Sequence, residues 1–260
     1  MNDPTKTTML RIELAKLLKK RYGTTMNKVL RVIDKYKPNT LAQIDSLFPK
    51  IGKVLDINNK KVNTLLGSYM GKSFKKGLNK TQLNINARSK QNINLGFNLK
   101  HQKALNNVLR MGFTDVKNVN DSIKNDLRRS LYDAMNNGEG IKGAKERIIA
   151  SFKKKPKKEL KAFQKDSRLT PEYRAELIAR TSIIKSYNEA AVEQLKQLGI
   201  KKKKWIAKMD KSTCEICKGL NNQVVGIDDQ FEFKEKKYNT APVHPNCKCM
   251  IIGVLKQGGR

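Results

Sequence analysis

The order of apolar and polar residues predicts a chain that is helical up to about residue 200. Apolar side chains recur at three- and four-residue steps, a spacing that places them on one face of an α-helix. Helices are therefore predicted at residues 5–22, 24–36, 41–48, 51–70, 101–111, 116–134, 141–152 and 171–198. We expect Gly23, Pro38, Pro49 and Gly52 to interrupt or end the earlier helices, because glycine and proline disfavour helix interiors.

The last of these helices has clear signals at both ends. Thr170 suits the N-cap, Pro171 suits the first helical position, and the Glu172 carboxylate favours the positive end of the helix dipole. Gly199 is a typical C-terminal stop. The apolar stripe over residues 177–198 predicts one long buried face.

Residues 71–97 have a different composition from the helices on either side. They are rich in Asn, Lys, Gly and Ser and contain few large apolar side chains. This composition predicts a flexible, extended connector within a basic helical region that spans residues 1–135.

After Gly199 the apolar residues alternate with polar ones, which is the period of a β-strand. The predicted strands are residues 204–209, 223–227 and 250–255. The predicted fold class is therefore α+β, with a mostly helical N-terminal part, a long helix and a small antiparallel β module at the C-terminus. We expect Asn188 and Arg180, both on the long helix, to tie it to this module.

The charge of the chain indicates a polyanionic partner. Lys and Arg number 55 against 23 Asp and Glu, which gives a formal net charge of +32. Residues 57–114 contain no acidic side chain, and further basic runs lie at 153–158 and 201–204. An excess of this size raises self-repulsion in the folded chain, so we predict non-specific contacts with the phosphates of double-stranded DNA.

Other classes of partner are disfavoured. No stretch approaches the roughly 20 apolar residues that span a bilayer, and the first residues lack the apolar core of a signal peptide. Gly138 and Gly140 are not followed by the Gly-Lys-Ser/Thr of a phosphate loop. We therefore predict neither a membrane partner nor a small-molecule substrate.

All four cysteines and one of the two histidines fall within two short clusters. Cys214 and Cys217 are spaced so that a tight turn directs both sulfurs at one ion, and His244, Cys247 and Cys249 form the second cluster. Four such donors make a tetrahedral zinc site. Our preferred ligands are Cys214, Cys217, His244 and Cys247, while Cys249 could replace either Cys247 or His244.

The pattern favours a structural zinc over a catalytic one. The available donors fill the coordination shell, and no H-x-E or H-E-x-x-H pattern supplies a base beside an open position. Glu215 is expected to point outward, and the isolated His101 is given no role. A pair of disulfides is the alternative, which a reducing cytosol disfavours. A structural zinc would help a small β module over residues 203–255 to fold.

These motifs resemble the phage head morphogenesis family, the Mu F-like minor head proteins of tailed viruses. The resemblance is carried by Ala179-Arg180-Thr181, Asn188, Gly199, Trp205, the run from Asp210 to Cys217, the run from Gly219 to Val225, and the run from Pro242 to Cys249. Asn222 stands where glycine is usual and Lys248 where arginine is commoner. The resemblance covers about residues 138–255, with helices over 139–199, whereas residues 1–135 carry no such motif.

The resemblance implies a non-catalytic minor structural head protein that acts in capsid assembly and DNA packaging. Its partners would be the portal protein, the major capsid protein and packaged DNA, and it would lie in the virion after assembly in the host cytoplasm. Some relatives carry an additional toxin-like transferase domain, for which we expect no room in this chain. The alternatives are a zinc-ribbon nucleic-acid-binding protein and a His-Asn-His-type nuclease, which needs a second histidine.

Overall fold

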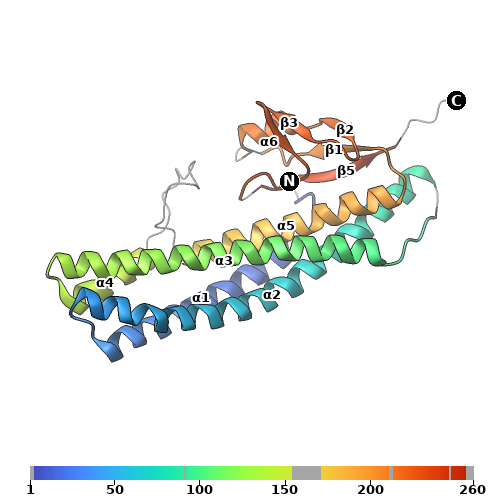
Figure 1. The fold of residues 1–260 in the computed structure, drawn as a ribbon. Helices are drawn as coiled ribbons and strands as arrows, with labels where there is room; N and C mark the ends of the chain where they lie inside the picture. The colour runs from blue at the N-terminus through green and yellow to red at the C-terminus, as the bar shows by residue number, and fades with distance from the viewer. Residues whose placement is uncertain (1–2, 91, 154–170, 211–212, 246, 256–260) are drawn as a thin grey trace. The chain divides into compact units, whose positions relative to one another are not determined.

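A computed structural model describes residues 3–90, 92–153, 171–210, 213–245 and 247–255 (Figure 1). The helices and strands are α1 (Thr8–Tyr36), α2 (Leu41–Ser89), α3 (Leu99–Asn136), α4 (Gly140–Lys153), α5 (Pro171–Gln197), β1 (Lys202–Ile206), α6 (Glu215–Leu220), β2 (Val224–Gly226), β3 (Phe231–Phe233), β4 (Lys236–Tyr238) and β5 (Met250–Val254). This order confirms the α+β class, with long helices first and a small antiparallel β module last. In the described residues, no helix is long and apolar enough to cross a membrane.

The predicted interruptions at Gly23, Pro49 and Gly52 are wrong, because α1 and α2 continue through them. Tyr22 and Met26 are both buried and continue one helical stripe past Gly23. Burial of such side chains contributes more than the roughly 1 kcal/mol that a glycine costs inside a helix. The predicted helices 101–111 and 116–134 are likewise parts of one helix, α3.

The predicted connector at 71–97 is also wrong over most of its length. Residues 71–89 belong to α2, where Phe74, Leu78 and Ile85 are buried at helical spacing. Three well-spaced apolar residues outweigh the polar composition on which the prediction depended. Among the described residues of this range, only Lys90 and residues 92–97 lack both helix and strand, as expected of a connector.

The chain forms two compact units. The first unit contains Met1–Ile12, Leu66–Gly112 and Arg180–Arg260, and the second contains Glu13–Leu65 and Phe113–Ala179. The predicted division into residues 1–135 and 138–255 stays a prediction. The N-cap residue Thr170 and, apart from Lys153, the basic run at 153–158 lie outside the described residues.

The second unit is helical, and it contains a partly buried ion pair. Arg174 of α5 donates to the Asp126 carboxylate of α3 at 2.7 Å and is only 5% exposed. Burial raises the pKa of Tyr22 well above its ordinary range, although the positive charge of Arg174 acts against this. Tyr22 therefore stays neutral at all ordinary pH values.

In the first unit, α2 and α5 approach closely through small residues. A Cβ at Gly77 would lie 2.4 Å from the Tyr187 carbonyl oxygen, so only glycine fits there. The Ser73 hydroxyl donates to the Ile183 carbonyl at 2.8 Å, and the Ser186 hydroxyl donates to the Met70 carbonyl at 2.6 Å. These contacts place α5 firmly against the second half of α2.

The β module of the first unit contains two small antiparallel sheets. The three-stranded sheet has the order β2-β1-β5, and Lys204 of β1 pairs with Val224 on one side and Ile252 on the other (Figure 1). The predicted strand 204–209 is shifted, since β1 ends at Ile206. The β3–β4 hairpin and α6 were not predicted. Lys234 and Glu235, the two turn residues of the hairpin, have positive φ angles of 49° and 62°, which residues such as Asn-Gly normally supply.

Candidate metal centre

The first pair of cysteines lies at the start of α6. Cys214 is the N-cap residue, and its sulfur accepts a hydrogen bond from the Cys217 backbone N–H at 3.4 Å. The Thr213 hydroxyl just before it accepts from the Asp210 N–H at 2.8 Å and donates to the Lys208 carbonyl. The turn into the helix therefore directs both sulfurs to the same side, as the C-x2-C spacing predicts.

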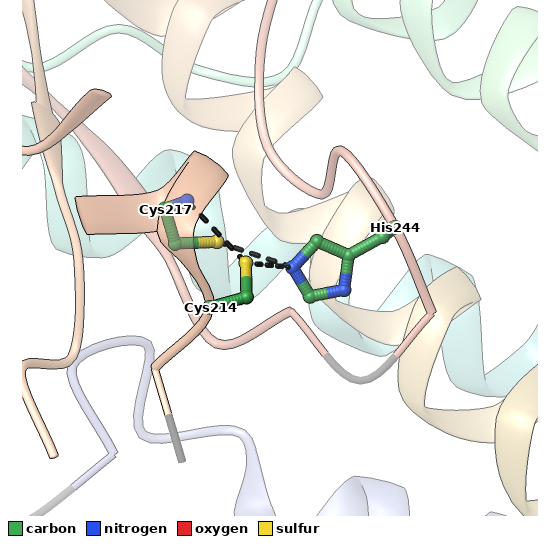
Figure 2. Close-up of side chains that lie close together, drawn as sticks. All are labelled: Cys214, Cys217 and His244. Carbon is green, nitrogen blue, oxygen red and sulfur yellow. Dashed lines mark hydrogen bonds between the residues drawn. The ribbon is translucent and has the colours of Figure 1, made fainter. Parts of the chain in front are cut away.

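His244 reaches these sulfurs from a loop that precedes β5 (Figure 2). Its Nε2 lies 3.1 Å from the Cys214 sulfur and 3.2 Å from the Cys217 sulfur. Its Nδ1 lies 2.6 Å from the Pro245 carbonyl oxygen. A proton on Nδ1 can be donated to that carbonyl, which leaves the lone pair of Nε2 available to a metal, the arrangement usual for metal-binding histidines.

The two remaining cysteines complete the cluster. The Cys247 sulfur lies 3.8 Å from the Cys217 sulfur. Cys217 belongs to two groups of possible ligands, one with Cys214 and His244 and the other with Cys247 and Cys249. Within each group, all ligand atoms lie within 4.8 Å of one another. A tetrahedral zinc with Zn–S bonds of about 2.3 Å separates its sulfurs by about 3.8 Å, so the observed spacing fits a single ion. All four thiols are free of disulfides.

The buried thiols have strongly perturbed acidities. The hydrogen bond from Cys217 to Cys247, with those to Cys249 and burial, raises the pKa of Cys217. Hydrogen bonds with Cys217 and Cys249 lower the pKa of Cys247, because they stabilise its thiolate. The close approach of these sulfurs therefore favours the thiolate at Cys247 over that at Cys217. A divalent cation would displace thiol protons and stabilise further thiolates.

Charged side chains surround the mouth of the cluster. A cavity of about 30 Å³ is lined by the five donors together with Lys208, Asp210, Thr213 and Lys248. The Asp210 carboxylate lies 3.0 Å from the Lys208 ammonium and 3.8 Å from that of Lys248. Three thiolates, one imidazole and Zn²⁺ would carry one net negative charge, which these two lysines are placed to balance.

A known protein family matches the part of the chain that contains the metal-ligand cluster. Residues 125–252 match the family described as Phage Mu protein F like protein. This part of the chain is similar to that family. The match includes α5, the β module up to Ile252 and all five metal-ligand candidates, and it confirms the resemblance to phage head morphogenesis proteins.

One curated relative is similar over a longer stretch. NAD(+)--arginine ADP-ribosyltransferase EFV of Enterococcus faecalis (strain ATCC 700802 / V583) is 22% identical over 240 residues, which cover 84% of this chain and 45% of that protein. The chain therefore spans less than half of the relative's length. No solved structure matches the chain.

Within the Mu F-like region, the structure brings all five predicted donors together. Glu215 points outward as predicted, since its carboxylate is exposed and pairs with Lys234 at 2.6 Å. His101 is absent from the metal-binding groups found among the described residues, and its Nδ1 accepts from the Asn98 N–H at 3.2 Å. The choice of Cys214, Cys217, His244 and Cys247 as the ligand set stays a prediction.

Sequence reasoning missed the polar surroundings of this Mu F-like site. Asp210, Thr213 and Lys248 all lie in the runs that carry the family resemblance, but no periodicity indicates their contacts. The available signal was proximity along the chain, since Thr213 and Lys248 adjoin Cys214 and Cys247 and Asp210 lies four positions before Cys214. Asn188 was predicted to tie the long helix to the β module, and it does so through the backbone on either side of Met250. The role of Arg180 stays a prediction.

Proposed function

We propose that this chain is a minor structural head protein of a tailed virus, acting in capsid assembly and DNA packaging near the portal. The observation that supports this most directly is the Phage Mu protein F like match over residues 125–252, which contains the metal-ligand cluster. In this proposal the protein lies in the virion and passes through the host cytoplasm during assembly.

The proposed metal is a structural Zn²⁺ held by Cys214, Cys217, His244 and Cys247. When bound, it would link the start of α6 to the loop before β5. Cys217 and Cys247 are only 3% and 2% exposed, and they pack in the same apolar cluster as Trp205. Because this cluster is small, a metal link between its two halves would contribute much of the module's stability.

We propose that the site is not catalytic. Its donors are sufficient to close a tetrahedral shell, whereas a catalytic zinc keeps one position for water and a base beside it. The Asp210 carboxylate, which lines the cavity of the cluster, is engaged by Lys208 and Lys248. A His-Asn-His-type nuclease also needs a second histidine, and His101 is fully buried on α3. The zinc-ribbon nucleic-acid-binding alternative shares the zinc and the charge but would be absent from virus particles.

The proposed partners are the portal or major capsid protein and packaged double-stranded DNA. The net charge of +32 supports DNA contacts, because each phosphate neutralised releases a counterion and favours binding. Neither a membrane nor a small-molecule substrate is part of this proposal.

The test is quantitative mass spectrometry of purified particles of the virus that encodes this chain, both full and without DNA. A few copies per particle are expected, against many of the major capsid protein. Fewer copies in empty particles would indicate retention by DNA. Absence from both kinds of particle would contradict the virion assignment and favour the zinc-ribbon alternative.

A further inference from the structure

The second half of α2 presents a row of lysines that continues into the N-terminal segment. Lys72, Lys75 and Lys76 are exposed, Lys80 is half-buried, and Lys6 is exposed. On a helix, residues three and four apart share a face, so the α2 lysines form one strip. We name these five residues the lysine surface, and all of them belong to the first unit.

The N-terminal segment is held onto α2 by this surface. The Lys76 ammonium donates to the Lys6 carbonyl at 2.6 Å, and the Lys80 ammonium donates to the Pro4 carbonyl at 3.0 Å. These bonds fix the backbone of residues 4–6 beside α2. They consequently place the Lys6 charge next to two other lysine charges.

In the part of the chain that the structure describes, salt bridges do not neutralise the positive charge of the lysine surface. Burial lowers the pKa of Lys80, and the positive charges of Lys6 and Lys76 lower it further, while Asp3 only partly offsets this. Asp3 itself pairs with Arg11 at 2.6 Å. Among the described residues, no carboxylate forms a salt bridge with Lys72, Lys75 or Lys76. Residues 57–114 contain no Asp or Glu that could do so.

Other lysines of the same unit are arranged differently. Lys196 pairs with Asp228 at 2.7 Å, and Lys234 pairs with Glu215 at 2.6 Å. Lys208 pairs with Asp210 at 3.0 Å. Several lysine charges of α5 and the β module are therefore balanced within the protein, whereas the lysine surface can attract an external anion.

We infer that the lysine surface is the place where this protein binds the phosphates of double-stranded DNA. This inference rests on the proposed function and locates its DNA contact. From Lys72 to Lys80 the helix rises by about 12 Å, which matches about three to four base pairs along the duplex axis. Ser68 and Asn79 are exposed on α2 close to these lysines and offer further donors to phosphate oxygens. Contacts of this kind position DNA without reading its sequence.

The test compares two triple variants of the full chain that remove the same charge. The first is Lys72→Gln with Lys75→Gln and Lys76→Gln, and its control is Lys234→Gln with Lys236→Gln and Lys237→Gln on the β3–β4 hairpin. Fluorescence anisotropy with a labelled duplex of mixed sequence gives the affinity over a salt series.

The readout is the slope of log K against log salt, in which each phosphate that the protein neutralises contributes about 0.9. We expect the steepness of this slope to fall by about two to three in the first variant, because three lysines no longer neutralise phosphates. In the control we expect it to fall by less than about one.

Each outcome of this comparison decides something. Equal effects of the two triple variants would overturn the assignment of DNA binding to the lysine surface, but not the proposal that the protein binds DNA. A wild-type chain that does not bind the duplex at low salt would overturn both the inference and the proposed DNA contact. Competition by polyglutamate as strong as that by unlabelled duplex, at equal charge concentration, would identify an acidic protein as the partner and overturn the DNA assignment.

A charge-conserving variant separates charge from folding. Lys72→Arg with Lys75→Arg and Lys76→Arg keeps the three positive charges, so it is expected to bind with the wild-type salt slope. If this variant loses affinity as the glutamine variant does, the lysines act through the fold and the inference fails.

Discussion

The side-chain amide of Asn188 on α5 donates a hydrogen bond to the backbone carbonyl of Cys249 at 3.1 Å. Its Oδ1 accepts from the Ile251 N–H at 2.9 Å, and the Asn188 side chain is fully buried. One residue thus satisfies two backbone groups that flank Met250 at the start of β5. The link fixes the strand that follows the metal-ligand loop to the long helix.

Replacing Asn188 should destabilise the first unit strongly. In Asn188→Leu the Cys249 carbonyl and the Ile251 N–H lose their partner in a buried setting, at about 1–3 kcal/mol for each group. The free energy of unfolding is expected to fall by about 3 kcal/mol in total. Urea titration followed by the fluorescence of Trp205, the only tryptophan and fully buried, measures this. Asn79→Leu, at an exposed site of α2, is the control and should change stability little.

The zinc content of cysteine variants tests which residues are the metal ligands. Purified wild-type chain is expected to hold one zinc, and Cys214→Ser should lose it and expose Trp205, because the metal links the two halves of the module. Elemental analysis together with Trp205 fluorescence checks this. Full zinc occupancy and an unchanged melting temperature in Cys214→Ser would rule out Cys214 as a ligand.

A second pair of variants distinguishes the two closely spaced cysteines. We expect Cys247→Ser to lose zinc and Cys249→Ser to retain it, since the Cys247 sulfur lies at the S–S spacing of a tetrahedral site from Cys217. Metal content of both proteins at equal protein concentration decides between them. The reverse pattern would assign Cys249 as the fourth ligand instead.

The close approach of α2 and α5 predicts a sharp difference between two glycines. In Gly77→Ala the new Cβ would lie 2.4 Å from the Tyr187 carbonyl oxygen, so the helices must separate, at about 1–3 kcal/mol. Gly71→Ala, on the same helix, meets nothing within 4 Å and should stabilise by about 0.5–1 kcal/mol. Thermal melts of both variants measure the difference, and equal melting temperatures would contradict the packing described for Gly77.

The N-terminal segment should respond to pH through Asp3. Burial alone would raise the pKa of Asp3, but Arg11 and hydrogen bonds from Thr5, Thr8 and the Thr7 N–H outweigh it and lower the pKa. A lowered native pKa means that the folded state binds fewer protons, so this stabilisation is present above about pH 4 and is lost as pH falls through the native pKa.

Hydrogen exchange of the amides of residues 5–12 checks this prediction. In Asp3→Asn their protection should be lower than in the wild type at about pH 7. The difference should vanish at acidic pH, once Asp3 of the wild type is protonated. A difference that is the same at both pH values would show that the charge of Asp3 does not hold the segment.

Some features of this protein are determined by the sequence alone, because they depend on neighbours along the chain. The Cys214–Cys217 spacing directs two sulfurs at one point through a single turn, and His244 and Cys247 repeat that spacing. The long helix that begins at Pro171 follows from an apolar stripe and local end signals. The positive charge is a sum over residues that needs no fold.

Other features were decided only by tertiary structure. The helices pass through Gly23 and Pro49 because buried side chains on either side outweigh a local cost of one residue. The hydrogen bonds of Asn188 join groups more than 60 positions apart, and Lys76 reaches the Lys6 carbonyl across 70 positions. No local pattern encodes such pairs, because they form only when whole helices pack, and packing depends on the summed burial of many side chains rather than on any one of them.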